Sequence, residues 1–264
     1  MRYCRFQTAE GPQYGELQKQ DGKDFISKLL PPPVEDKSCV LSAQKFKRTA
    51  LDDVKLLAPV APSKIVCVGR NYRDHARELG NEVPSEILIF LKPPSAVIAT
   101  GEAIIIPAIS QRVDFEGELG VVIGKQCRNL MEREEARSYI RGYICANDVT
   151  ARDLQKTDGQ WTRAKGFDTF CPLGPIVSDE VDPWAGLEVE TKVNGVRRQL
   201  GNTRDFVFSL DKLMRYVSSI MTLYPGDLIL TGTPAGVAPL QSGDTVEVSI
   251  SGIGQLKNPV QALR

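Results

Sequence analysis

Two glutamates, Glu116 and Glu118, lie two positions apart in the segment VDFEGELGVVIGK, residues 113–125. Successive side chains of a strand point to opposite faces, so both glutamates share one face while Gly117 points the other way and leaves room for close packing. An exposed polar stripe is the alternative, but the run GVVIG is apolar on both faces and indicates a buried strand. Two close carboxylates in a partly dry place repel each other unless a cation separates them or one takes a proton. The spacing therefore predicts a divalent-ion site.

A third oxygen ligand is predicted at Asp148. The apolar segment GYICA, residues 142–146, indicates a strand, and Asp148 follows its end, where functional residues are often positioned. An Asx turn or a helix cap is the alternative reading of such a residue. Two glutamates and one aspartate leave positions open on an octahedral ion, an arrangement that suits Mg²⁺ or Mn²⁺.

A candidate base is His75, the only histidine of the chain. The segment NYRDHARELG, residues 71–80, predicts a short helix that is capped by Asn71 and ends before Gly80. Glu78 lies three residues after His75 and shares its face of the helix. A carboxylate there would orient the imidazole and raise its basicity. The alternative is an exposed histidine on a polar helix.

Composition excludes several classes of partner. The 264 residues include 33 basic and 33 acidic side chains, and no basic cluster indicates binding to nucleic acid or to an anionic membrane. No apolar run approaches the roughly 18 residues of a membrane span, and the first residues lack the apolar core of a signal peptide. The six cysteines form no C-x-x-C pair, which favours reduced thiols and a cytoplasmic protein.

The elements that must position these residues predict a β-rich α+β chain. Short strands at 2–7 and 13–18 precede a polar, proline-marked region, so we expect a small N-terminal β domain over residues 1–60 and a metal-dependent catalytic domain over 61–264. Helices are predicted at 71–80, at 129–142 with Asn129 as its cap, and at 209–223. Further strands are predicted at 88–92, 103–106, 118–123, 187–193, 227–230 and 245–250, with a hairpin turn at Asn194 and Gly195.

Taken together, the motifs resemble the fumarylacetoacetate hydrolase family, and in particular its short-chain branch of acylpyruvase-like and fumarylpyruvate hydrolase-like proteins. The matching stretches cover roughly residues 60 to 264 and run in the order KIVCVGRNYRDHARELG, LKPPSAVI, VDFEGELGVVIGK, GYICANDVTARDLQ, QWTRAKGFDTFCPLGP, VNGVRRQLGNTRDFVFS and YPGDLILTGTPAGV. The resemblance implies a β-roll catalytic domain behind a small N-terminal β domain, usually assembled as a homodimer.

The resemblance also implies roles for individual residues. In this family the E-x-E strand and the aspartate after the next strand bind Mg²⁺, Mn²⁺ or Ca²⁺, the histidine after GRNY activates water with the help of a glutamate, and a lysine lies near metal and substrate. The matching positions are Glu116, Glu118 and Asp148 for the metal, and His75, Glu78 and Lys165 for catalysis. Those for substrate binding are Tyr72, Arg152, Gln155 and Thr233. The namesake hydrolase has a further aspartate ligand near the position of Asn71, so three protein carboxylates are expected here. Asp114 is left without a role.

The implied reaction is hydrolysis of the carbon–carbon bond of a 2,4-dioxo acid, such as an acylpyruvate or fumarylpyruvate. His75 would deprotonate a water that attacks the 4-carbonyl, and cleavage would leave the enolate of pyruvate, stabilised by the metal and Lys165. The same scaffold also supports decarboxylation of oxaloacetate and isomerisation or decarboxylation of 2-oxo-diene diacids. A non-catalytic metal-binding protein is a third possibility. Retention of His75 and Glu78 favours the hydrolase.

Overall fold

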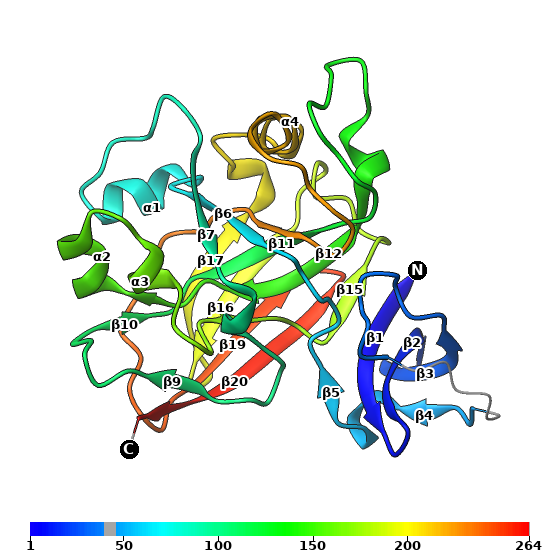
Figure 1. Ribbon diagram of the computed structural model, residues 1–264. Helices are drawn as coiled ribbons and strands as arrows, with labels where there is room; N and C mark the ends of the chain where they lie inside the picture. The colour runs from blue at the N-terminus through cyan, green and yellow to red at the C-terminus, as the bar shows by residue number, and fades with distance from the viewer. Residues whose placement is uncertain (40–45, 264) are drawn as a thin grey trace.

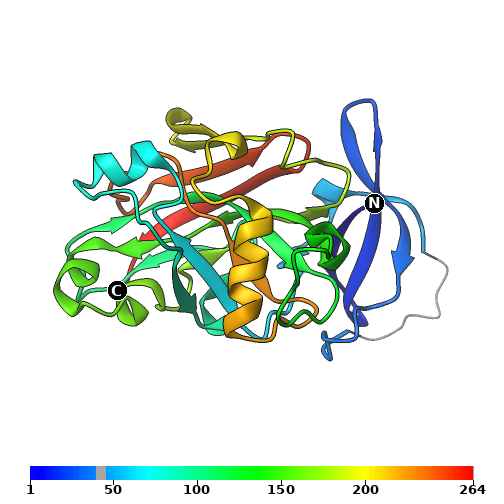
Figure 2. The same cartoon turned by 90° about the horizontal axis from the view of Figure 1, so that it is seen from above.

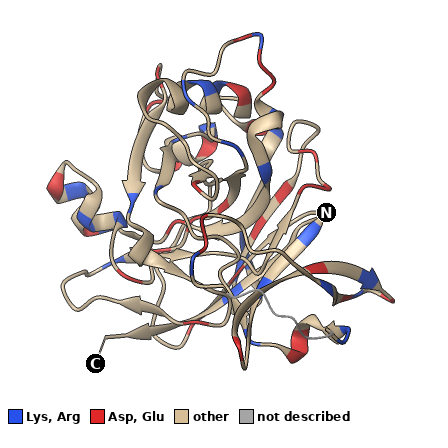
Figure 3. Ribbon diagram, turned by 45° about the vertical axis from the view of Figure 1, so that its right-hand side comes forward, with Lys and Arg blue, Asp and Glu red and all other residues tan. Residues whose placement is uncertain are grey.

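The structure is a computed structural model that describes residues 1–39 and 46–263, and it confirms the β-rich α+β class (Figure 1). Most strands belong to one large sheet or to a five-stranded sheet. The first strands form a lobe at one end of the molecule, and the C-terminus lies at the opposite end (Figures 1 and 2). Basic and acidic residues are both spread along the ribbon of the molecule (Figure 3).

The large sheet has the strand order β4-β3-β2-β1-β15-β12-β11-β18-β6-β7, and β5 pairs with β1. Its strands are β1 (Arg2–Thr8), β2 (Gly11–Gln20), β3 (Lys23–Leu30), β4 (Thr49–Ala50), β5 (Leu56–Leu57), β6 (Ile65–Gly69), β7 (Leu88–Lys92), β11 (Gly117–Ile123), β12 (Ile140–Asn147), β15 (Ile176–Ser178) and β18 (Leu228–Leu230). Antiparallel pairing of β1 with β15 joins the N-terminal strands to the rest of this sheet.

The second sheet has the order β17-β16-β19-β20-β9, and two short pairs complete the strands. Its strands are β17 (Val196–Asn202), β16 (Glu188–Val193), β19 (Thr245–Ile250), β20 (Gly254–Ala262) and β9 (Ile104–Ile106). The short pairs are β10 (Val113–Asp114) with β13 (Thr150–Ala151), and β8 (Val97–Ile98) with β14 (Cys171–Pro172). The predicted turn at Asn194 and Gly195 connects β16 to β17, and both residues have positive φ, as a two-residue hairpin turn requires.

The largest core cluster lies where β11 of the large sheet meets β16 and β19 of the second sheet, and α4 (Leu210–Ile220) packs against it. β11 is buried along its whole length, because a second cluster covers its other face. This double burial explains why the strand is apolar on both faces. Ser209 caps α4 by accepting a hydrogen bond from the backbone N–H of Lys212.

The remaining helices are short: α1 (Arg73–Glu78), α2 (Arg152–Asp158) and α3 (Thr162–Lys165), together with the 3₁₀ turns η1 (Leu51–Asp53), η2 (Pro94–Ala96), η3 (Ala136–Tyr139) and η4 (Thr203–Asp205). Figure 1 places α1, α2 and α3 at the same end of the molecule. Among the residues described, no helix is long and apolar enough to cross a membrane.

The helix predicted over residues 129–142 is wrong. Asn129 has φ of 50°, and only η3 forms within this stretch before β12 begins. The carbonyl oxygens of Glu132 and Glu134 accept hydrogen bonds from the Arg215 guanidinium instead of from N–H groups of a following helical turn. A contact from α4, distant in sequence, therefore overrides the local helix signals.

Asn71 is also not a helix cap, because α1 starts after Tyr72 and no side chain caps it. The buried amide of Asn71 instead joins two other segments: its oxygen accepts from Phe208 N at 2.8 Å, and its nitrogen donates to Thr231 O at 2.8 Å. The predicted end of the helix is confirmed, since Gly80 follows it with φ of 69°.

Candidate active site

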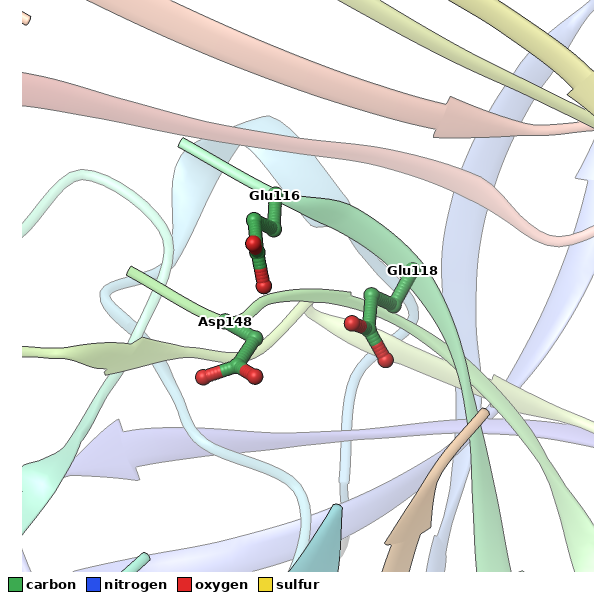
Figure 4. A group of neighbouring side chains, drawn as sticks. All are labelled: Glu116, Glu118 and Asp148. Atoms are coloured by element: carbon green, nitrogen blue, oxygen red, sulfur yellow. The ribbon is translucent and has the colours of Figure 1, made fainter. Parts of the chain in front are cut away.

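The three predicted carboxylate ligands come together at the ends of two neighbouring strands. Glu116 and Glu118 flank the start of β11, which pairs with β12 so that Gly117 lies opposite Asn147. Asp148 follows β12 and donates its backbone N–H to Glu116 O at 2.8 Å. One ligand oxygen from each carboxylate lies within 4.8 Å of the others, and Figure 4 shows the three groups converging on one space. The exposed-stripe alternative is wrong, because all three residues are buried.

Close packing behind the carboxylates is confirmed at Gly117. A Cβ there would overlap Thr191 Oγ1 and lie 3.2 Å from Val248 Cγ1. The Gly117 backbone is held on both sides, since its N–H donates to Gln199 Oε1 at 3.0 Å and its carbonyl accepts from the Thr233 hydroxyl at 2.9 Å. The glycine lets β11 approach the second sheet closely while its neighbours point into the site.

The donor set fits a hard divalent cation. Burial, together with the charges of Asp148 and Glu116, raises the pKa of Glu118 well above its ordinary value. The backbone N–H of Gly232 donates to Glu118 Oε2 at 2.7 Å, but it brings no full charge to balance the carboxylate. A cation between the three groups would remove this repulsion, and all-oxygen ligands suit Mg²⁺ or Mn²⁺. These residues therefore fit such an ion by their chemistry and spacing.

Three basic side chains surround the acidic cluster. Lys165 Nζ donates at 2.7 Å to both Glu116 Oε2 and Asp148 Oδ2. Arg152 donates to Glu116 Oε1 from its other side. Burial by itself raises the pKa of Glu116, but the charges of Arg152 and Lys165 outweigh it and hold that pKa below its ordinary value. Glu116 therefore stays ionised at neutral pH.

Lys92 is the third basic residue, and the sequence analysis missed its contact with the site. Its ammonium group is buried at the end of β7 and donates to Asp148 Oδ1 at 2.6 Å and to Val149 O at 3.1 Å. A lysine that ends the apolar run LIFLK was the available signal, because a charge in such a place needs a buried partner.

His75 and Glu78 lie on α1 as predicted, and His75 is buried, so the exposed-histidine alternative is wrong. His75 Nδ1 is 3.4 Å from Glu78 Oε2, and its Nε2 is 3.9 Å from Glu116 Oε1. Burial lowers the pKa of His75, an effect that the charge of Glu116 offsets in part. The imidazole is therefore largely neutral at pH 7 and able to accept a proton. Glu78 also accepts from Gly236 N at 3.0 Å, which ties α1 to the loop after β18.

A cavity of about 480 Å³ opens over this cluster. Eight of the ten residues that the sequence and the resemblance singled out line it: His75, Glu116, Glu118, Asp148, Arg152, Gln155, Lys165 and Thr233. Glu78 contacts His75 from behind without lining the cavity. The outer walls add the apolar side chains of Leu79, Phe90 and Trp161.

Tyr72 does not reach this cavity, contrary to the substrate contact implied by the resemblance. The Tyr72 ring packs edge to face against Phe206, with centroids 5.1 Å apart, and borders a separate hollow beside Pro234. Thr233 does line the cavity, but its hydroxyl is already engaged, donating to Gly117 O and accepting from Gln199 Nε2 at 2.8 Å.

Asp114, which the sequence left unexplained, is fully buried and forms ion pairs with Arg112 and Arg152. It belongs to β10, which pairs with β13, whereas Gly117 begins β11 of the large sheet. The three alternating carboxylates therefore do not share one strand, because the chain changes pairing partner at Phe115 and Glu116.

Comparison with known protein families matches nearly the whole chain. The family described as Fumarylacetoacetate (FAA) hydrolase C-terminal matches residues 64–261, and the one described as Rv2993c-like, N-terminal matches residues 1–59. Among individual relatives, the oxaloacetate tautomerase YisK of Bacillus subtilis is 42% identical, over 93% of this chain and 92% of its own length.

Two solved structures extend the comparison. The 5-carboxymethyl-2-hydroxymuconate delta-isomerase from Mycobacterium smegmatis is 40% identical and superposes with a TM-score of 0.86 over 100% of both chains. The fumarylpyruvate hydrolase from Pseudomonas aeruginosa, solved in complex with Mn²⁺ and pyruvate, is 32% identical with a TM-score of 0.72, over 78% of this chain and 91% of that chain. Proteins similar to this one thus include a tautomerase, an isomerase and a hydrolase.

Proposed function

Because the chain belongs to the fumarylacetoacetate hydrolase family, we propose that it is a divalent-metal-dependent enzyme that hydrolyses the carbon–carbon bond of 2,4-dioxo acids of the acylpyruvate or fumarylpyruvate type. The observation that carries the proposal is the buried His75, with its Nδ1 3.4 Å from Glu78 Oε2, beside three carboxylates that fit a metal ion. The fumarylpyruvate hydrolase with bound Mn²⁺ and pyruvate supports both the metal and the product.

The proposed metal ligands are Glu116, Glu118 and Asp148, holding Mg²⁺ or Mn²⁺, with Ca²⁺ as a further candidate. When bound, such an ion polarises the oxygens of a 2-oxo acid and stabilises negative charge that develops on them. Lys165 and Lys92 fix the orientation of Asp148 through one oxygen each, at 2.7 and 2.6 Å. These contacts keep the aspartate aimed at the common space of the three carboxylates.

In the proposed reaction, His75 takes the proton from a water at Nε2, the ring nitrogen that faces Glu116 and the cavity. The Glu78 carboxylate accepts a hydrogen bond from His75 Nδ1–H, which favours the tautomer whose Nε2 is unprotonated and can take this proton. The resulting hydroxide attacks the 4-carbonyl of the substrate, and the bond between C3 and C4 breaks. Lys165, beside Glu116, stabilises the negative charge left on the pyruvate half.

Arg152 and Gln155 are proposed to bind the acidic end of the substrate, since both line the cavity beside Glu116. We assign no substrate contact to Tyr72 and limit Thr233 to shaping the wall, because its hydroxyl is engaged by protein partners. The apolar side chains of Phe90 and Trp161 suit the carbon chain beyond the 4-carbonyl. The small molecule is thus held between a charged end and an apolar end.

Tautomerisation of oxaloacetate is a second candidate function. It is favoured by YisK, which matches 93% of this chain at 42% identity, whereas the fumarylpyruvate hydrolase matches 78% at 32% identity. The same His75 would then move a proton between C3 and the 2-oxygen instead of activating water. No bond between carbons breaks in that reaction, so the two candidates differ in their products.

The test is to incubate the protein, with Mg²⁺ or Mn²⁺, with acetylpyruvate, fumarylpyruvate and oxaloacetate, and to follow both ultraviolet absorbance and proton NMR. Release of pyruvate from a dioxo acid, lost in His75→Ala and in Glu116→Ala, supports the hydrolase. Faster keto–enol exchange of oxaloacetate without pyruvate release from any dioxo acid refutes it in favour of the tautomerase. Metal binding without turnover of any of the three compounds leaves a non-catalytic metal-binding protein.

We further propose that the protein acts in the cytoplasm as a homodimer. All six cysteines are free, which suits a reducing compartment. The homodimer is the assembly expected from the family resemblance. Sedimentation of the purified chain at micromolar concentration tests it, and a species of 29.1 kDa, the mass of one chain, would refute it.

A further inference from the structure

Asp114 holds two arginines that line the active-site cavity. Its Oδ1 accepts from Arg112 Nε at 2.9 Å, and its Oδ2 accepts from Arg112 Nη2 at 3.0 Å and from Arg152 Nε at 2.9 Å. The backbone supports the pairing, because Arg152 N donates to Arg112 O at 2.8 Å where β10 meets β13. Asp114 is fully buried, so water does not compete for these bonds.

Arg152 has one acceptor for each nitrogen of its guanidinium group. Nε donates to Asp114, Nη1 to Gln155 Oε1 at 2.9 Å, and Nη2 to Glu116 Oε1. Three acceptors, one on each nitrogen, fix the orientation of the group, and each Nη keeps one further N–H for another partner. Without Asp114, the Nε side of Arg152 would lose its only charged partner and the plane could turn about the remaining two.

We propose that Asp114 is a positioning residue, which orients Arg152 so that its free N–H groups bind the carboxylate of a 2-oxo acid beside the metal-binding cluster. The part concerning the 2-oxo acid rests on the proposed function, whereas the orientation of Arg152 does not. Arg112 completes the arrangement by filling the second side of the Asp114 carboxylate. Asp114 itself does not touch substrate, since it does not line the cavity.

The orientation is tested without substrate by observing the Nε–H signal of Arg152 in ¹⁵N NMR spectra, assigned by its loss in Arg152→Lys. The wild-type signal is expected to be sharp and protected from solvent exchange, and Asp114→Asn is expected to abolish that protection. Asparagine has a single acceptor oxygen and places an NH₂ against one of the arginines. Asp153→Asn is the matched control: Asp153 is next to Arg152 in sequence but accepts from Ser110 and Gln111 N. Retained protection in Asp114→Asn, or equal loss in Asp153→Asn, would overturn the proposal.

The consequence for binding is tested by titrating pyruvate into the protein at saturating Mn²⁺. Asp114→Asn is expected to weaken pyruvate binding by roughly tenfold or more, as for loss of a charge-assisted hydrogen bond. The double variant with Arg152→Gln should bind no more weakly than Arg152→Gln alone, because Asp114 acts through Arg152. Independent, multiplicative losses would overturn the proposal, since they indicate a general structural effect.

Two further outcomes remain decisive. If Asp114→Asn does not fold, Arg152→Lys replaces it, because lysine keeps the charge but lacks the planar group that Asp114 orients. Lysine should then weaken pyruvate binding by roughly tenfold, and wild-type affinity would overturn the proposal. If the wild-type protein does not bind pyruvate at all, the proposed function fails, while the protection of the Arg152 signal still decides the role of Asp114.

Discussion

The glycine between the two glutamates offers a sharp test of how the acidic cluster is built. Alanine at position 117 would place a Cβ inside van der Waals contact with Thr191 Oγ1, and 3.2 and 3.3 Å from the two methyl carbons of Val248. The backbone of Gly117 cannot easily withdraw, because Gln199 and Thr233 hydrogen-bond it from both sides. The strain must therefore fall on the second sheet, or on the start of β11 that carries Glu118.

The expected magnitude follows from two opposing effects. Extra volume in a closed core costs about 1–3 kcal/mol. Alanine also lowers the conformational entropy of the unfolded chain, which stabilises the folded protein by about 0.4–1 kcal/mol at a position without positive φ, such as Gly117. We expect Gly117→Ala to lower the free energy of unfolding by about 1–2 kcal/mol, or the melting temperature by roughly 2–8 °C for a chain of this size. Mn²⁺ affinity should fall with it, because Glu118 moves with the strand.

A double-mutant cycle in urea identifies the source of the strain. The Thr191 hydroxyl is buried without a hydrogen-bond partner among the described residues, so Thr191→Ala removes the obstacle without breaking a hydrogen bond. In that background Gly117→Ala should cost at least about 1 kcal/mol less. Gly120→Ala is the matched control, since its Cβ would meet Ile144 instead and Thr191→Ala should not relieve it. Wild-type stability of Gly117→Ala, or equal relief of both alanine variants, would refute the reasoning.

Three further predictions concern charged groups. Without metal, Glu118→Gln should unfold at no lower urea concentration than wild type, because burial and neighbouring charges disfavour the ionised form of Glu118. With Mn²⁺ at a hundred times its Kd, wild type should gain roughly 2.7 kcal/mol of stability, and Glu118→Gln should lose this gain. Lys92→Met should lower the free energy of unfolding by about 3 kcal/mol in urea, because Asp148 loses a buried partner, and an unchanged midpoint would contradict this. Burial raises the pKa of Asp36, but hydrogen bonds from Ser38 outweigh it and lower that pKa in the folded protein. The ionised Asp36 therefore stabilises the fold fully above the unfolded-state pKa of about 3.9, and this stabilisation is lost as pH falls through the folded-state pKa. The difference in melting temperature between wild type and Asp36→Asn should therefore be larger at pH 7 than at pH 3, and the opposite trend would contradict this sign.

The convergence of the three carboxylates could be predicted because it depends on local periodicity and on strand ends. Glu116 and Glu118 were assigned to one face from a two-residue period, and the structure keeps that geometry even though β11 begins only at Gly117. Asp148 was predicted from its place after an apolar strand, and antiparallel pairing with β11 brings it beside Glu116. Both inferences need only the direction of side chains and the end of a strand.

The errors arose where a distant segment decides the local structure. Residues 129–142 have the composition of a capped helix, but Arg215 of α4 donates hydrogen bonds to two backbone carbonyl groups in this stretch. Asn71 has the composition of a cap, yet its amide is used between Phe208 and Thr231, which are more than 130 residues away. These hydrogen-bond partners are distant in sequence, so local helix propensity could not predict either local structure.

Asp114 shows how one charge pattern divides into two roles. A strict two-residue alternation places Asp114, Glu116 and Glu118 on one face, and a single straight strand would have put three negative charges side by side. The chain avoids this by changing partner strands between Asp114 and Gly117, so that Asp114 pairs with arginines while Glu116 and Glu118 remain with Asp148. Arg152 then joins both groups, with one nitrogen on Asp114 and another on Glu116. A change in the orientation of that one guanidinium group should therefore alter both the proposed metal ligands and the binding of the proposed substrate carboxylate.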